Sequence, residues 1–259
     1  MRRIRLYQVD AFTDRVFAGN PAAVCLLDAW LDDATLQAIA AENNLSETAF
    51  LVREQNLYAI RWFTPSVEID LCGHATLAAA FVVFQFVEPR IDKVVFGSAS
   101  GPLIVTRDAE RLCMDFPALP AGACSPPQAL FEAVGGYPAQ VLEARDYLLV
   151  FASTDDVLSL EPDMQLLASL QRHVIVTAPG SDVDFVSRFF APGAGIAEDP
   201  VTGSAHCTLV PYWAKRLDKN KLHARQVSKR GGELVCELRG ERVILAGQAV
   251  LYLEGTICL

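Results

Sequence analysis

The chain has 259 residues, enough for two domains, because a single domain commonly holds about 100 to 150 residues. Its 52% of hydrophobic and 20% of charged residues are typical of a globular protein and argue against extensive disorder. The net charge of −9 makes the field of the whole protein repel phosphate polymers and anionic membrane surfaces, so neither nucleic acid nor a membrane is an expected partner.

Strands and helices are both predicted before residue 117. Alternating and apolar runs predict strands at 3–12, 22–27, 47–52, 57–63, 93–98, 102–107 and 111–116. A helix is predicted over 32–44, with Asp32 or Asp33 as its cap. A second, almost entirely apolar helix begins near Gly73.

A domain boundary is predicted at residues 117–127, which contain four prolines and a glycine. The N-terminal half is then 1–116 and the C-terminal half 117–259, with the last strand free to return to the first half. Beyond the boundary, the pattern predicts a helix at 127–136, strands at 146–153 and 173–179, a helix after Pro200, and strands at 233–240 and 242–255. Because Pro211 lies inside that second helix, we expect a kink or an early break there.

Targeting and cysteine usage are typical of a cytoplasmic protein. Residues 1–12 are basic without a continuous apolar run, unlike a signal peptide. The uncharged stretch 71–87 only just reaches the length of about 17 residues that a membrane helix needs, and a buried helix explains it better. Seven scattered cysteines without a CxxC pair predict reduced thiols, and four histidines without HxxxH or HExxH spacing predict no metal site.

An internal repeat is the most informative feature of the sequence. "RWFTP" at 61–65 returns as "RFFAP" at 188–192. In each copy a glutamate, Glu68 or Glu198, stands four residues before the start of a helix, at Cys72 or Thr202. Ordered elements at nearly constant offsets predict that each half is one copy of a duplicated fold.

The duplication brings a glycine to the start of a helix in each half. Gly73 and Gly203 stand where the first backbone N–H groups of a helix have no partner within it. Without a side chain there, a small carboxylate could approach these amides and the positive end of the helix dipole. The glycines could equally serve only to let two central helices pack closely.

Five motifs carry a resemblance that covers nearly the whole chain. They are "DAFTDRVFAGNPAAV", "NLSETAF", "DLCGHATLAAA", "RFFAPGAGIAEDPVTGSAH" and "GQAVLYLEG". In these motifs the chain is similar to the PhzF-like (phenazine biosynthesis-like) isomerase family, whose halves share the fold of diaminopimelate epimerase. The resemblance implies an α+β protein of two pseudo-symmetric halves, each a curved, barrel-like β-sheet around a central hydrophobic helix, with the active site in the cleft between them. It also implies a homodimer.

The resemblance bears directly on Cys72. Epimerases of this fold use two cysteines, one at each helix start, to remove and return a proton on opposite faces of a carbon. Here the repeat mate of Cys72 is Thr202, whose hydroxyl is far too weak an acid to replace a thiol. Cys72 alone could act as a one-sided base, but a lone cysteine at a buried helix start more often serves packing.

The resemblance assigns the general acid/base to Glu47 in "LSETAF", with His74 and Asp199 completing the catalytic set. From the residues alone, Glu47 would be read as an exposed acid at the start of a strand. His74 could instead cap its helix, and Asp199 could be a plain cap before Pro200.

Five further residues are candidates for substrate binding. They are Asn20, Ser46, Gly73, Gly203 and Ser204. Asn20 and Ser46 could equally hold turns.

The resemblance therefore implies an isomerase that moves a proton within a small unsaturated or cyclic carboxylate. No Gly-rich nucleotide motif is present, so no cofactor is expected. Two alternatives remain open: an epimerase or racemase that uses Cys72 with another acid, and a non-catalytic protein that has kept the fold.

Overall fold

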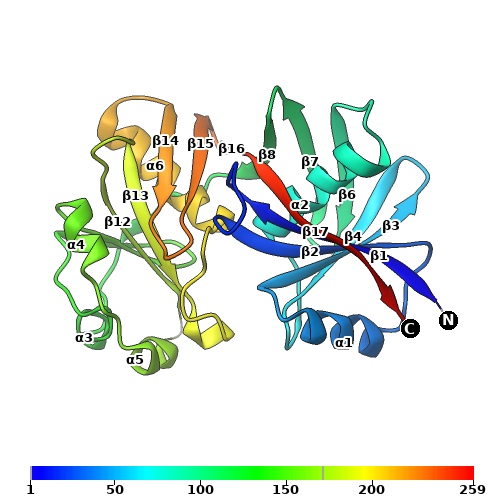
Figure 1. The fold of residues 1–259 in the computed structure, drawn as a ribbon. Helices are drawn as coiled ribbons and strands as arrows, with labels where there is room; N and C mark the ends of the chain where they lie inside the picture. The colour runs from blue at the N-terminus through cyan, green and yellow to red at the C-terminus, as the bar shows by residue number, and fades with distance from the viewer. Residues whose placement is uncertain (1, 171) are drawn as a thin grey trace. The chain divides into compact units, whose positions relative to one another are not determined.

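The computed structural model describes residues 2–170 and 172–259, and the chain forms two compact units. Unit 1 extends to Asp115 and includes Ala246–Leu259, whereas unit 2 is Phe116–Leu245. The closing segment lies in unit 1 because β17 (Ala249–Cys258) pairs antiparallel with β1 (Arg3–Ala11), as the red and blue strands of Figure 1 show. Unit 2 therefore ends at Leu245, inside the predicted strand 242–255.

Unit 1 is a curved sheet around one apolar helix. Its other strands are β2 (Asn20–Leu27), β3 (Glu47–Glu54), β4 (Leu57–Phe63), β5 (Glu68–Ile69), β6 (Lys93–Ser98), β7 (Gly101–Asp108) and β8 (Arg111–Pro117). The central helix α2 (Gly73–Val82) packs against β1, β2, β3 and β17, and its side chains are almost all buried. A π-helical turn, η1 (Val83–Val87), follows it directly.

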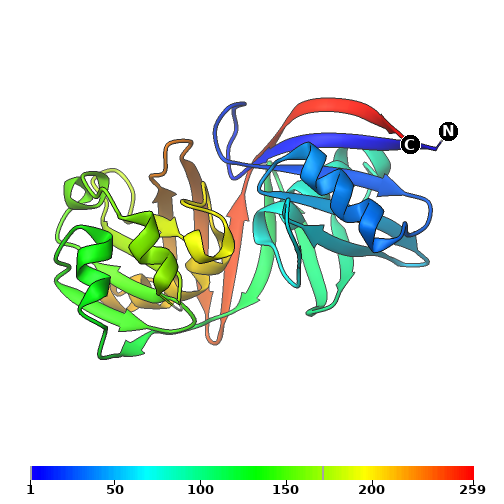
Figure 2. The same ribbon diagram turned by 90° about the horizontal axis from the view of Figure 1, so that it is seen from below.

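Helix α1 (Asp33–Asn43) covers the outside of this sheet. The side chain of Asp32 caps it by accepting the N–H of Thr35 at 2.9 Å. Its buried residues Leu36, Ile39 and Ala40 share a core cluster with β3 and β4, which it overlies in Figure 2. The helix predicted over 32–44 is therefore a helix on the surface of unit 1.

Unit 2 repeats this plan with more helices outside. Its strands are β9 (Gly122–Ala123), β10 (Gln140–Glu143), β11 (Tyr147–Val150), β12 (Val174–Pro179), β13 (Phe185–Phe190), β14 (Lys221–Gln226), β15 (Gly232–Arg239) and β16 (Arg242–Gly247). Its helices are α3 (Ala129–Val134), α4 (Thr154–Leu158), α5 (Met164–Ser169), η2 (Pro192–Ala194) and α6 (Gly203–Leu217).

The two units pair their strands in the same order. In unit 1 the pairs β1/β2, β2/β3, β3/β4, β4/β6 and β6/β7 are antiparallel, parallel, antiparallel, parallel and antiparallel. In unit 2 the pairs β10/β11, β11/β12, β12/β13, β13/β14 and β14/β15 follow the same sequence of directions. The predicted fold class, α+β with two pseudo-symmetric halves, is thereby confirmed.

The repeated motif gives the same local structure twice. Arg61 donates Nε and a terminal nitrogen to the two oxygens of Glu68, at 2.6 Å each, and its guanidinium lies 5.1 Å from the Phe63 ring centre. Arg188 binds Glu198 in the same bidentate way, at 2.8 and 3.1 Å, and lies 4.9 Å from the Phe190 ring. Such paired hydrogen bonds fix the loop that leads to each helix.

Removing these two arginines is expected to have unequal effects on stability. Arg188 also donates to the carbonyls of Val157 and Leu160, and its side chain is only 13% exposed, against 26% for Arg61. We expect Arg188→Met to lower the free energy of unfolding by about 2 kcal/mol, since it leaves Glu198 and two carbonyls without a charged donor. Arg61→Met, the matched change, should cost about 1 kcal/mol or less because that pair is more exposed. Urea unfolding measures both, and equal losses would contradict the argument.

Helix α6 continues past Pro211, so the expected early break is wrong. Proline removes the N–H that would bond the carbonyl of Cys207 four residues earlier. That carbonyl instead accepts the N–H of Leu119 at 2.9 Å. An amide in the loop after β8 thus donates the hydrogen bond that the helix lacks, and the helix remains intact to Leu217.

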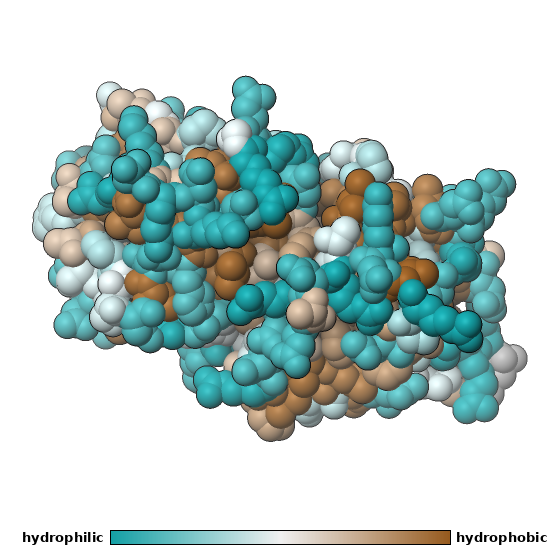
Figure 3. All heavy atoms as spheres, turned by 90° about the horizontal axis from the view of Figure 1, so that it is seen from above, coloured by the Kyte–Doolittle hydropathy of each residue, from teal (hydrophilic) through white to brown (hydrophobic). Residues whose placement is uncertain are grey.

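The surface mixes apolar and polar groups. On the face drawn in Figure 3, hydrophobic residues in brown are interspersed with hydrophilic ones in teal. Within the described ranges, no helix is long and apolar enough to cross a membrane.

Candidate active site

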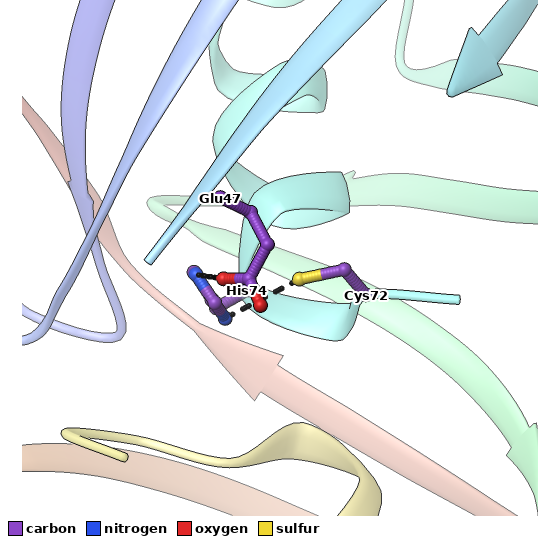
Figure 4. Close-up of side chains that lie close together, drawn as sticks. All are labelled: Glu47, Cys72 and His74. Carbon is purple, nitrogen blue, oxygen red and sulfur yellow. Dashed lines mark hydrogen bonds and ion pairs between the residues drawn. The ribbon is translucent and has the colours of Figure 1, made fainter. Parts of the chain in front are cut away.

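Three chemically reactive side chains meet at the start of α2 in unit 1 (Figure 4). Glu47 is the first residue of β3, Cys72 precedes α2, and His74 is the second residue of that helix. They are 5%, 6% and 4% exposed. Glu47 is therefore not an exposed strand-start acid, and the fold has enclosed all three groups.

His74 lies at the centre of this group. Its Nε2 is 2.9 Å from Oε2 of Glu47, while its Nδ1 is 3.1 Å from Nδ2 of Asn20 and 3.5 Å from Sγ of Cys72. The close contact with Glu47 is not aligned as a hydrogen bond. Oε2 and Nε2 thus have no directed hydrogen-bond partner within residues 2–170 and 172–259. Buried polar atoms normally have one, so these two atoms are free to bind a ligand.

Burial and nearby charge set the protonation of the site. Burial, together with the negative charge of Glu47, raises the pKa of the Cys72 thiol to about 11. Burial by itself would lower the pKa of His74, but the interactions with Cys72 and Glu47 outweigh burial and raise this pKa well above its usual value. Since the thiol keeps its proton at neutral pH, Glu47 is the effective partner of the imidazolium there.

Both helix starts have the same backbone arrangement. Neither Cys72 before α2 nor Thr202 before α6 caps its helix with its side chain. Four residues on, Thr76 Oγ1 donates to the carbonyl of Cys72, and His206 Nδ1 donates at 2.8 Å to that of Thr202. The first amides of each helix, at Gly73 and Gly203, are thus not covered by a capping side chain.

The start of α6 in unit 2 is held by a glutamine that the sequence did not single out. Gln226, at the end of β14, is fully buried; it donates to the carbonyl of Asp199 at 2.7 Å and accepts the N–H of Thr202 at 2.9 Å. The Thr202 hydroxyl donates to the Asp199 carboxylate at 2.5 Å. Asp199 is therefore not a plain helix cap, because its carboxylate binds a side chain while α6 begins only at Gly203.

The remaining predicted residues divide between the two units. Ser204 accepts a hydrogen bond from Arg145 at 3.0 Å, and Arg145 also pairs with the buried Asp146 at 3.0 Å. Ser46 is half-buried and, in the described part of the chain, makes no side-chain hydrogen bond to Glu47 or His74. Asn20 joins the Glu47 group, whereas Asp199, Gly203 and Ser204 form a separate group in unit 2.

Strand register shows that the two units are chemically unlike at this point. Thr48 pairs with Phe63, and Val174 pairs with Phe190, the matching aromatic residue of the repeat. Thr48 and Val174 therefore occupy equivalent positions in the two units. The residue before them is Glu47 in unit 1 but His173 in unit 2. Thr202 likewise replaces Cys72. Unit 2 has neither a carboxylate nor a thiol where unit 1 has both.

Comparison with known proteins agrees with this fold. The family described as phenazine biosynthesis-like protein matches residues 9–255. An uncharacterised isomerase of Pseudomonas aeruginosa is 52% identical over 99% of each chain. A PhzF-family phenazine biosynthesis protein of Enterococcus faecalis, at 48% identity, superposes over 100% of each chain with a TM-score of 0.97. A probable proline racemase of Agrobacterium radiobacter, at 11% identity, covers 99% of this chain and 93% of its own with a TM-score of 0.67, which is a likeness of fold alone. The chain therefore belongs to the phenazine biosynthesis-like protein family and is an isomerase.

Proposed function

We propose that Glu47 moves a proton from one carbon to another within a small unsaturated or cyclic carboxylate. The observation that supports this most is the buried Oε2 of Glu47, which lacks an aligned hydrogen-bond partner in the described residues and lies 2.9 Å from the His74 imidazole. A carboxylate in such a place can take a proton and later return it on the same face of the substrate. One group then serves both steps.

His74 has a distinct part in this mechanism. A charged imidazole beside the carboxylate can donate its Nε2–H to the oxygen of a substrate carbonyl or carboxylate, where negative charge develops as the proton leaves carbon. The Asn20 side-chain amide lies against Nδ1 on the other side of the ring and helps to hold it in place. Loss of the proton from carbon is then assisted at the oxygen that receives the charge.

We assign substrate binding to Asn20 and to the two helix starts. Gly73 and Gly203 leave backbone amides open to a carboxylate, and the dipoles of α2 and α6 favour negative charge at these ends. Within unit 2, Asp199 and Ser204 are the candidate hydrogen-bonding groups beside Gly203. A small acid fits these groups better than a neutral molecule.

The structure offers little support for an epimerase that uses two thiols. Such an enzyme needs a second base at the position of Thr202, and the hydroxyl there is already donated to Asp199. The only equivalent of Glu47 in unit 2 is His173, as the strand register above requires. A single base acting on one face is the simpler reading of this asymmetry.

Isomerisation in D2O tests the proposal. A panel of unsaturated and cyclic carboxylates, incubated with the enzyme and followed by NMR, should contain at least one compound that shifts a double bond or a hydrogen position. Deuterium should appear at the new C–H and depend on Glu47. Exchange confined to one stereocentre, lost in Cys72→Ser but kept in Glu47→Gln, would instead identify a thiol epimerase.

A further inference from the structure

We propose that Glu47, Cys72 and His74 also form a binding site for a soft divalent cation such as Zn²⁺, and that the occupied site is inactive. Each of these residues offers one ligand atom, and the three atoms lie within 4.8 Å of one another. The metal-binding part of this inference stands on the geometry alone, whereas the inhibitory part rests on the proposed function.

The separation of the sulfur and nitrogen atoms suits a tetrahedral ion. Zinc binds thiolate sulfur at about 2.3 Å and imidazole nitrogen at about 2.0–2.1 Å, so a tetrahedral angle sets these two ligands about 3.5 Å apart. Sγ of Cys72 and Nδ1 of His74 are 3.5 Å apart. The same distance also suits a thiol–imidazole hydrogen bond, so by itself it does not indicate a metal site. The Glu47 carboxylate beside these two groups adds the third ligand that a metal site needs.

The donor types select the ion. One thiolate, one imidazole and one carboxylate provide three protein ligands and leave a fourth position open, as in catalytic zinc sites. Thiolate favours zinc and similar soft ions, whereas Mg²⁺ and Ca²⁺ prefer oxygen ligands alone. On binding, the Cys72 thiol and the His74 imidazolium each release one proton to solvent, so that a thiolate and a neutral imidazole bind the ion.

Spacing in the sequence could not show this site. Cys72 and His74 are separated by one residue, and Glu47 comes from a different strand, so no recognised zinc motif is formed. In the fold the three side chains are pre-positioned and 4 to 6% exposed. The ion must displace the contacts that the Asn20 amide and the Cys72 thiol make with Nδ1.

Occupation would block catalysis directly. The ion would bind a carboxylate oxygen of Glu47 and Nδ1 of His74. Glu47 could then not accept a proton from the substrate, and the His74 ring could not be protonated to imidazolium. Substrate and metal would therefore compete for the same side chains. The consequence is inhibition by low concentrations of Zn²⁺ that a chelator reverses.

Cobalt provides a readout that does not depend on activity. The purified wild-type protein, titrated with Co²⁺ under anaerobic reducing conditions, should develop a near-ultraviolet charge-transfer band from cobalt–thiolate bonding, and added Zn²⁺ should abolish it. Cys72→Ser should lose the band. Metal affinity should fall by about 100-fold or more, because outer-sphere partners alone typically account for about 10- to 100-fold.

Two further variants complete the test. Cys258→Ser removes an exposed thiol and should leave the band unchanged, whereas His74→Gln should weaken cobalt binding while keeping the thiol. Zn²⁺ should inhibit the wild type and Cys258→Ser but spare the activity of Cys72→Ser. A cobalt–thiolate band that persists in Cys72→Ser, or no such band in the wild type, overturns the site. A band without inhibition by Zn²⁺ overturns the inhibitory role and leaves the proton-transfer proposal intact.

Discussion

Glu47→Gln is expected to reduce turnover by about 10²-fold or more while substrate binding survives, because the amide keeps the size of the carboxylate but cannot accept a proton. The side chain is 5% exposed beside His74, so bulk water cannot readily replace it as the base. Steady-state kinetics on the substrate found in D2O would measure the loss. A fall in kcat without a matching rise in KM marks a group that acts in the transition state.

Cys72→Ser and Cys72→Ala should keep most of the activity. With its pKa raised to about 11, the Cys72 thiol is almost entirely protonated at pH 7 and is therefore a poor base. The losses that remain should reflect packing at the start of α2. An alkylating agent should likewise inactivate slowly, because the thiol is buried as well as protonated.

Glu54→Gln is the matched control for Glu47→Gln. It makes the same chemical change at the other end of β3, where the side chain is exposed, and should leave turnover unchanged. If folded Cys72→Ser loses turnover while Glu47→Gln keeps it, the thiol is the base and the assignment of Glu47 is wrong.

The sequence predicted the duplicated fold well because its evidence was local. "RWFTP" and "RFFAP" begin on β4 and β13, and in both copies the arginine pairs with the glutamate that follows it. Strand β13 was nevertheless not predicted as a strand, although its match to 57–63 was the available signal. The short helices α4 and α5 and the strands β10 and β14 were also missed, since their apolar runs are brief.

The active site depended on contacts between distant residues, which single-sequence patterns do not reveal. Glu47 reaches His74 because β3 starts beside the first residues of β2, where Ala22 pairs with Glu47 and Asn20 lies close by. Only the family resemblance marked Glu47. Nothing local marked Gln226 or Arg145, because a polar residue at a strand end is common and its partner lies tens of residues away.

His206 is expected to make the protein less stable in mild acid. Burial lowers the pKa of His206 to about 4, although its hydrogen bond to the Thr202 carbonyl acts in the opposite direction. In the unfolded chain the pKa is near its ordinary value of about 6.5. Between these two values the unfolded state binds a proton that the folded state does not, so stability is full above about pH 6.5 and is lost as pH falls toward about 4.

The size of this loss follows from the shift. A difference of roughly two and a half pKa units corresponds to about 3 kcal/mol at full protonation. The physical reason is that Nε2 is buried with no hydrogen-bond partner among the described residues, so an added proton there would have neither water nor an acceptor. The ring packs instead against Phe185, which stacks on Trp213.

Urea unfolding at a series of pH values from 7 to 4.5 tests this with a variant that cannot titrate. His206→Asn keeps a donor for the Thr202 carbonyl but has no imidazole to protonate. Whatever its stability at pH 7, this variant should lose less stability than the wild type as the pH falls. The carboxylates contribute equally to both proteins, so the difference between the two curves reports His206. His223→Asn is the control, since that ring is 42% exposed and paired with Glu233. Because this variant still contains His206, it should lose stability on acidification as the wild type does. Parallel stability curves for the wild type and His206→Asn would contradict this prediction. They would mean that His206 binds a proton in the folded state as readily as in the unfolded state, with an acceptor other than the packing around Phe185.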